Sequence, residues 1–232
     1  MNNKPLNKYI CVIVKDEQLY INDWIDYHLK KGFSKIVIYN NGYTSYNVDK
    51  YRNDVEILEW HPINPEPNQQ VMAYNHFLRT HQNMGFALFI DVDEYLWGEI
   101  PQRGNIVLED ITYDANQQLF YKEEPVYVRF TREAVLNMTC NIKTFVDLSN
   151  SGSFVSCHRT DSLLTDIDGY IIPDHCIEKR TSRRSYIRHY LTKSLEEYLA
   201  KLKRGNITKG LRTVDYFFRV NPDMLTSFKQ VL

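Results

Sequence analysis

The residues best suited to chemistry in this chain lie together in the segment Asp91-Val-Asp93-Glu94. The apolar run before them, residues 86–90, has the length and composition of a buried strand. Three carboxylates this close repel one another unless a cation lies between them, and oxygen ligands of this kind suit a divalent metal ion shared with a phosphate. Asp-x-Asp alone is also typical of a solvated turn or a helix N-cap, but the preceding strand favours a metal–diphosphate site.

The segments around these carboxylates alternate between strand and helix. Apolar periodicity predicts strands at residues 9–15, 35–39, 54–59 and 86–90, and helices at residues 18–31 and 68–81. This alternation is typical of a parallel sheet with crossover helices. Strands end at Asp16-Glu17, at Asn40-Asn41 and at the carboxylate segment, so we expect these polar groups at one sheet edge, facing a nucleotide.

The second half of the chain is less regular. Short strands are predicted at residues 126–131, 142–146, 154–157, 170–172 and 186–190. Ser194 is expected to cap a helix over residues 194–204, Gly205 to end it, and residues 214–232 to form one or two helices. Without an internal repeat or a low-complexity linker, residues 1–232 are expected to form a single domain in two functional halves.

Composition and charge restrict the class of protein. The net charge of −1 argues against a general nucleic-acid-binding protein. Lys and Arg outnumber Asp and Glu between residues 176 and 212, which suits either a solvated helix face or contact with phosphates or an anionic membrane. Since the chain has neither an apolar N-terminal segment nor a bilayer-length apolar run, we expect a cytoplasmic protein, able to contact the inner face of the cell membrane peripherally.

The cysteines offer a different metal site. None of the four has CxxC spacing, but Cys157-His158 and His175-Cys176 could together supply the ligands of a Cys2His2 zinc site. Adjacent residues of a strand point to opposite sides, so both members of such a pair rarely reach one ion. The carboxylate site is therefore the favoured interpretation.

Several segments, in this order along the chain, resemble one enzyme family. They are Val12-Ile-Val-Lys-Asp-Glu17, Trp24-Ile-Asp-Tyr-His28, Ile38-Tyr-Asn-Asn-Gly42, Gln70-Val-Met-Ala-Tyr-Asn75, Ile90-Asp-Val-Asp-Glu-Tyr-Leu96 and Ile187-Arg-His-Tyr-Leu-Thr-Lys-Ser194. Together they resemble GT-A fold glycosyltransferases, in particular the bacterial family 2-like and family 92-like group. The resemblance implies an α/β, Rossmann-like, mostly parallel central sheet with flanking helices and the DxD motif at the C-terminal end of a central strand.

The resemblance also implies a function and a division of the chain. Residues 1–100 or so would bind a nucleotide sugar, and residues 101–232 would bind the acceptor. The implied reaction is metal-dependent transfer of a sugar, with galactose as one candidate, from a UDP-sugar to a glycan or lipid-linked acceptor in bacterial surface polysaccharide or lipopolysaccharide biosynthesis. Inversion at the anomeric carbon is expected, with Mn2+ or Mg2+ as cofactor.

Site residues follow from the same resemblance. Metal ligands would be Asp91, Asp93 and His189, and donor contacts would be Lys15, Glu17, Asn40, Gln70, Asp91 and Lys193. Asn40 replaces the usual aspartate of its turn and can still accept a hydrogen bond from a uracil N–H. The alternatives are a core histidine for His189, a solvated basic face for Lys193 and a helix cap for Glu17.

Transfer to a hydroxyl group needs a base that takes the acceptor proton. Carboxylate candidates are Asp161, Asp166, Asp168 and Asp174. We favour Asp168 as the base, with His158 as a second catalytic candidate, although Asp168 also suits a simple loop carboxylate before Gly169. Trp97 could stack on a sugar ring or belong to the core.

Two rival functions use the same scaffold. A nucleotidyltransferase is expected to have a Gly-rich loop after the first strand that binds a triphosphate. Lys15-Asp16-Glu17-Gln18 contains no glycine, which argues against this function. A catalytically inactive GT-A-like binding module would not need Asp91-Val-Asp93 together with His189. The glycosyltransferase is therefore the leading hypothesis.

Overall fold

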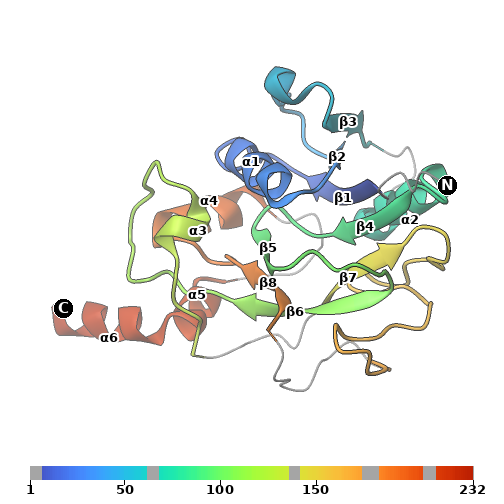
Figure 1. Cartoon of the computed structure of the whole chain (residues 1–232). Helices are drawn as coiled ribbons and strands as arrows, with labels where there is room; N and C mark the ends of the chain where they lie inside the picture. The colour runs from blue at the N-terminus through green and yellow to red at the C-terminus, as the bar shows by residue number, and fades with distance from the viewer. Residues whose placement is uncertain (1–6, 62–67, 136–141, 174–182, 206–212, 232) are drawn as a thin grey trace.

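The computed structural model describes residues 7–61, 68–135, 142–173, 183–205 and 213–231. The strands are β1 (Asn7–Val14), β2 (Lys35–Asn40), β3 (Val55–Glu59), β4 (Gly85–Phe89), β5 (Glu94–Gly98), β6 (Ile106–Thr112), β7 (Ile142–Asp147) and β8 (Ser185–His189). The α-helices are α1 (Ile21–Lys31), α2 (Gln69–Thr80), α3 (Val126–Arg129), α4 (Leu195–Arg204), α5 (Val214–Val220) and α6 (Pro222–Val231). In the described part of the chain the strands form one curled, eight-stranded sheet in the order β3-β2-β1-β4-β7-β6-β8-β5 (Figure 1).

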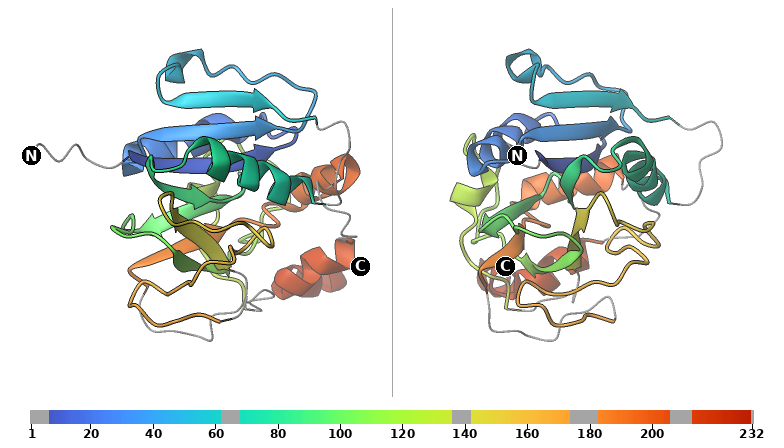
Figure 2. Two further views of the ribbon diagram at one scale, coloured as in Figure 1. Left: turned by 90° about the vertical axis from the view of Figure 1, so that its right-hand side faces the viewer. Right: turned by 45° about the vertical axis from the view of Figure 1, so that its right-hand side comes forward.

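The first four strands form the parallel part of the sheet, with α1 and α2 on opposite faces (Figure 2). Ile10 and Val12 of β1 belong to the core that contains Trp24 of α1. Cys11 belongs to the second core, with Phe77 of α2. Because both faces are covered, β1 is apolar at every position from Tyr9 to Val14, as is typical of parallel sheets. The strands and helices expected before residue 90 are confirmed, with ends that move by three residues at most.

The parallel pairing of β1 with β2 and with β4 brings the ends of these strands to one edge of the sheet. The turn after β2 lies against the end of β1, where Thr44 Oγ1 donates to Asp16 Oδ1 at 3.1 Å. A Cβ atom on Gly42 would lie 2.6 Å from the same oxygen and 3.0 Å from Asp16 N, so a larger residue there would displace the Asp16 side chain. The edge therefore combines Asp16, Asn40 and the carboxylates that follow β4.

The sheet is mixed, and the expectation of a mostly parallel sheet is not confirmed. Strand β7 is antiparallel to β4 and β6, β5 is antiparallel to β8, and only β6 and β8 pair in parallel in the second half. The chain turns directly from β4 into β5 instead of crossing through a helix. Helix α1 then holds β5, because Trp24 Nε1 donates to Glu94 O and Tyr27 Oη donates to Leu96 O, both at 2.8 Å.

Sequence analysis was least accurate between residues 94 and 173. Strands β5 and β6 were not predicted, and residues 126–129 form the short helix α3 after Pro125, where a strand was expected. Residues 154–157 and 170–172 contribute only the isolated bridges Phe154–Thr160 and Thr165–Ile171. Of the apolar side chains in these two runs, Phe154 and Ile172 are buried, whereas Val155, Tyr170 and Ile171 are exposed. The backbone there is irregular, and local periodicity does not distinguish such a segment from a strand.

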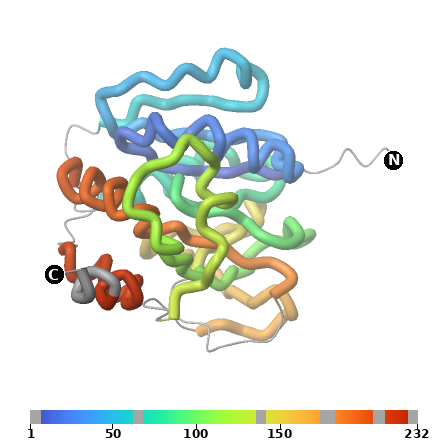
Figure 3. Tube along the Cα trace, turned by 90° about the vertical axis from the view of Figure 1, so that its left-hand side faces the viewer, coloured from blue at the N-terminus to red at the C-terminus, as the bar shows by residue number. Residues whose placement is uncertain are grey.

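Helix α4 begins as expected at Ser194, whose side chain accepts from Glu197 N while the Glu197 side chain accepts from the backbone N–H of Ser194. Glu197 also pairs with Arg129 at 2.7 Å, both side chains being buried, and accepts from Tyr20 Oη at 2.9 Å. These contacts tie α4 to α3 and to the start of α1, and α4 lies beside α1 (Figure 3).

The expected closing helices are confirmed as α5 and α6. No helix among the described residues has both the length and the apolar character to cross a bilayer.

Candidate functional site

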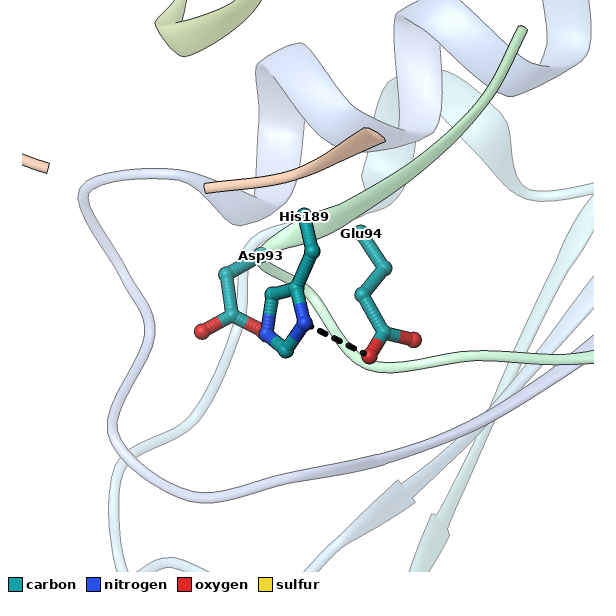
Figure 4. Close-up of side chains that lie close together, drawn as sticks. All are labelled: Asp93, Glu94 and His189. Carbon is teal, nitrogen blue, oxygen red and sulfur yellow. Dashed lines mark ion pairs between the residues drawn. The ribbon is translucent and has the colours of Figure 1, made fainter. Parts of the chain in front are cut away.

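The most concentrated group of potential metal ligands among the described residues is Asp93, Glu94 and His189, which are all buried. One ligand atom of each lies within 4.8 Å of the others. Glu94 opens β5 and His189 closes β8, and the antiparallel register of these strands pairs the two residues directly. Figure 4 shows the imidazole of His189 beside both carboxylates.

The orientation of His189 is set by Asp110 of β6. Nδ1 of His189 lies 3.1 Å from both carboxylate oxygens of Asp110, and Nε2 lies 3.6 Å from Asp93 Oδ1. A proton on Nδ1 that is donated to Asp110 directs the other ring nitrogen toward Asp93, which is the arrangement of metal-binding histidines in general. Burial lowers the pKa of His189, but Asp110, Asp93 and Glu94 outweigh it and raise this pKa to about 10.

Asp91 is held by two side chains that reach it from different elements. Gln70 Nε2 of α2 donates to Asp91 Oδ1 at 2.7 Å, and Lys143 Nζ of β7 donates to Asp91 Oδ2 at 3.0 Å. Lys143 is buried and also lies 2.9 Å from Glu94 Oε2. Burial raises the pKa of Asp91, and the Lys143 ammonium more than offsets this and lowers it. The carboxylate of Asp91 is thus fixed in direction, with its side chain still 36% exposed.

Glu94 is buried between these two groups. Its Oε2 accepts from Asp91 N at 2.9 Å, whereas its Oε1 is buried without a hydrogen-bond partner. Burial, followed by repulsion from Asp91 and Asp110, raises the pKa of Glu94 to about 8, although Lys143 and His189 oppose the shift. The side chain therefore has an unsatisfied oxygen that faces His189.

The charge of the whole cluster tests whether a divalent metal ion fits. Its members are the carboxylates Asp91, Asp93, Glu94 and Asp110, the ammonium groups of Lys143 and Lys201, and the imidazole of His189. Once His189 and Glu94 have released the protons that their raised pKa values favour, the four carboxylates exceed the two ammonium groups by two charges, so a divalent ion that displaces those protons balances the cluster. Carboxylate oxygens and an imidazole nitrogen are ligands that Mn2+ and Mg2+ accept. The residues present therefore fit such an ion, held by Asp93 and His189 with Glu94 Oε1 nearby.

Beside Asp93 is a pocket of about 190 Å³ between the loop after β1 and helix α4. Cationic side chains line it: Lys201 Nζ lies 2.5 Å from Asp93 Oδ2, and Arg204 Nη2 lies 2.6 Å from Glu17 Oε1. Lys193 is buried at the pocket with its Nζ 4.4 Å from the centre of the Tyr20 ring. Asp16, Glu17 and Glu197 line the pocket as well, but the ammonium groups of Lys193 and Lys201 and the guanidinium of Arg204 are donors of the kind that suit a diphosphate.

The structure brings most of the expected donor and metal residues to this edge. Asp91, Asp93, Gln70, His189, Lys193 and Glu17 belong to the cluster or the pocket. The Glu17 side chain pairs with Arg204, while its carbonyl oxygen accepts from Tyr20 and Ile21 at the start of α1. Lys15 lies just beyond β1 and is partly buried.

Asn40 is buried, and its side chain forms hydrogen bonds within the turn that follows β2. Its Oδ1 accepts from Gly42 N at 3.2 Å, and its Nδ2 donates to both carboxylate oxygens of Glu59 at 3.1 Å. Asn40 is only 2% exposed, so these hydrogen bonds serve the turn itself. Its direct role here is to shape the turn.

The two catalytic candidates lie in different places. His158 Nδ1 donates to Ile142 O at 3.0 Å, and burial, then Lys143, lowers the pKa of His158 to about 4. Asp168 pairs with Arg184 at 2.9 Å. Arg184 precedes β8, whose far end is His189, a separation of about 16 Å along an extended strand. The structure does not bring Asp168 to the carboxylate cluster.

The other predicted residues are accounted for as follows. Asp166 accepts from the backbone of Asp168 and Tyr170, and Asp161 accepts from Ser153 N, so both shape loops. The Arg188 guanidinium carbon lies 3.5 Å from the centre of the Trp97 ring, and neither residue lines the pocket. Asp174, His175 and Cys176 fall outside the described residues, and with them the second half of the zinc prediction.

Sequence reasoning missed Lys143, Lys201 and Asp110. A lysine inside the apolar strand Ile142–Asp147 was the available signal for Lys143, because a buried ammonium needs a buried carboxylate. Glu197, Lys201 and Arg204 recur at helical spacing, which places them on one face of α4. Asp110 carried no signal beyond an acid in an apolar run.

Comparison with known families gives one match. Residues 9–162 match the model described as Glycosyltransferase family 92. No protein of curated function is detectably similar to the chain. The matched region spans β1 to β7 and includes Asp91, Asp93, Asp110 and Lys143, whereas His189 and helix α4 lie beyond it.

Proposed function

The chain belongs to glycosyltransferase family 92, and from this premise we propose that it transfers a sugar from a UDP-sugar to a hydroxyl group of a glycan or lipid-linked acceptor. The observation that carries the proposal is the pairing of Asp93 with His189 Nε2, beside a pocket lined by cations. A carboxylate–imidazole pair suits the divalent ion, and the cations suit the diphosphate of a nucleotide sugar.

Asp93 and His189 would hold Mn2+ or Mg2+, which when bound supplies Lewis-acid stabilisation of the departing diphosphate. Lys193 and Arg204 add positive charge on the pocket wall, where charge develops as the glycosidic bond breaks. Asp91, held in direction by Gln70 and Lys143, would accept from hydroxyl groups of the donor. Fixed partners of this kind hold a substrate in a reactive orientation.

The acceptor hydroxyl must lose a proton, and His158 is the better placed of the two base candidates. Lys143 and Asp91 lie close enough to influence its pKa, and a pKa of about 4 leaves the imidazole unprotonated at neutral pH, although it also makes the imidazole a weak base. We further propose that transfer inverts the anomeric carbon, and that residues 101–232 contribute the acceptor side of the site.

The proposed setting is bacterial surface polysaccharide or lipopolysaccharide biosynthesis in the cytoplasm. A lipid-linked acceptor would be presented at the inner face of the cell membrane. The excess of Lys and Arg between residues 176 and 212 supports peripheral contact with that anionic surface.

The test is calorimetric binding of UDP, GDP and CDP, each with and without Mn2+, to the wild type and to Asp93→Ala. We expect UDP to bind more tightly with Mn2+, and Asp93→Ala to lose this gain. Asp26→Ala is the control, because Asp26 of α1 forms an exposed ion pair with Lys50, away from the proposed site. If no nucleotide binds the wild type in any of these conditions, the proposed function is wrong.

A further inference from the structure

Lys201 contacts the residue that the proposed metal ion needs. Its Nζ lies 2.5 Å from Asp93 Oδ2, while the other oxygen of the same carboxylate faces His189 at 3.6 Å. The Lys201 side chain is mostly buried, and Asp93 is buried with it. An ammonium group in this position supplies part of the positive charge that a divalent ion would otherwise bring to Asp93.

The surroundings of Lys201 offer it a second anionic partner. Glu197, Lys201 and Arg204 point from one face of α4 into the pocket, where Lys193 also lies. Burial lowers the pKa of Lys193, and repulsion from the charge of Lys201 lowers it further. The pocket also holds Asp16, Glu17 and Glu197, and Glu17 pairs with Arg204 while Glu197 pairs with Arg129. The ammonium groups of Lys193 and Lys201 are the cations that an entering diphosphate would meet, and Lys201 would meet it within reach of Asp93.

We propose that Lys201 exchanges partners during loading: it holds Asp93 when the site is empty, opposes the divalent ion there, and turns to the diphosphate when donor and ion bind together. This inference rests on the proposed function. Because Lys201 then favours the full complex and disfavours the ion alone, it makes the binding of ion and nucleotide mutually dependent.

Competition with the ion and simple support of the fold predict opposite effects of removing Lys201. A residue that only stabilised Asp93 would, once removed, weaken binding of the ion. A competing cation would, once removed, strengthen binding of the ion alone and weaken binding of the diphosphate. The two effects have opposite signs, and one substitution measures both.

The experiment compares wild type, Lys201→Met and Lys201→Gln. Free Mn2+ is measured by electron paramagnetic resonance without nucleotide, and the best-binding of UDP, GDP and CDP is titrated by calorimetry with and without Mn2+. Lys203→Met is the matched control, because Lys203 is an exposed residue of the same helix. Urea unfolding confirms that each variant is folded.

For both Lys201 variants we expect tighter Mn2+ binding without nucleotide and weaker nucleotide binding with Mn2+. The change in coupling should lie in the range of about 5- to 150-fold that is typical of linked sites. Folded variants whose Mn2+ affinity is unchanged or lower overturn the inference, as does tighter Mn2+ binding with unchanged nucleotide affinity. A wild type that binds neither ligand instead overturns the proposed function itself.

Discussion

At the scale of single residues, the cluster depends on buried side chains that hold the candidate ligands in place. Asp110 directs the imidazole of His189, and Lys143 holds Asp91 and Glu94. Each is buried and bonds to a residue of the proposed site. Partners of this kind fix the direction of a ligand atom, which matters because metal binding and donor binding both depend on geometry.

Replacing Asp110 by Asn should weaken the proposed metal site while keeping the size of the side chain. The amide can still accept from His189 Nδ1, but the negative charge that favours this arrangement is lost. We expect Mn2+ affinity, measured without substrate by electron paramagnetic resonance, to fall by about 10- to 100-fold. Asp147→Asn at the end of β7 is the control, and wild-type Mn2+ affinity in folded Asp110→Asn would contradict the assigned role.

Replacing Lys143 by Met should destabilise the fold strongly. Asp91 and Glu94 would lose their shared buried counter-charge, which typically costs about 3–5 kcal/mol in the free energy of unfolding. Urea denaturation measures this loss. The control is Lys35→Met, since the Lys35–Glu56 pair is exposed and such pairs contribute about 0–1 kcal/mol. Equal losses in the two variants would show that Lys143 is not a required counter-charge.

At the scale of secondary-structure elements, α4 has both a structural end and a functional face. Its first turn contains the capping box of Ser194 and Glu197. Glu197 also forms an ion pair with Arg129 and accepts a hydrogen bond from Tyr20 Oη. Its later turns carry Lys201 and the guanidinium of Arg204 into the pocket. The position of these cations therefore depends on how firmly the start of the helix is held.

Substituting Ser194 by Ala should measure that dependence. The variant loses the side-chain acceptor for Glu197 N, and we expect a loss of about 0.5–2 kcal/mol in the free energy of unfolding. Thr213→Ala is the matched control, because Thr213 occupies the N-cap of α5 without a side-chain capping hydrogen bond. A similar loss for both substitutions would remove the special role of the α4 cap.

At the scale of the whole molecule, α1 joins the parallel strands to the far end of the curled sheet. His28 is buried at this junction, with Nδ1 2.9 Å from Trp24 O and Nε2 3.4 Å from Leu96 N. Burial lowers the pKa of His28 to about 3, although the bond to Trp24 opposes the shift. The neutral ring can donate to Trp24 and accept from Leu96, whereas a protonated ring cannot accept from Leu96.

This junction should make stability depend on pH. The folded-state pKa of His28 lies below the ordinary value of 6.5, so the unfolded chain binds the extra proton between about pH 3 and 6.5. The contribution of His28 is therefore complete above pH 6.5 and decreases as pH falls, by about 1.4 kcal/mol per pH unit at most. His28→Gln should show a smaller slope in urea unfolding between pH 4 and 7, and identical slopes would contradict the assignment.

The sequence by itself determined the order of elements from β1 to β4, the helix cap at Ser194 and the position of the carboxylates after an apolar strand. These features are local: a strand or helix repeats its apolar residues within a few positions, and a cap bonds to a residue three positions away. The same local information indicated that Asp16, Asn40 and Asp91 each follow a strand. The expectation that these strands are parallel then implied that the three residues lie at one edge of the sheet.

Only the tertiary structure decided the antiparallel half of the sheet and the partners of the carboxylates. Strand β5 pairs with β8, and the contacts Lys143–Asp91, His189–Asp110 and Lys201–Asp93 span 52, 79 and 108 positions of the chain. The position of Asp168, away from the cluster, was decided in the same way. Burial of one charge depends on which distant charge the fold brings beside it, and that choice is made by packing of the whole core rather than by neighbouring residues.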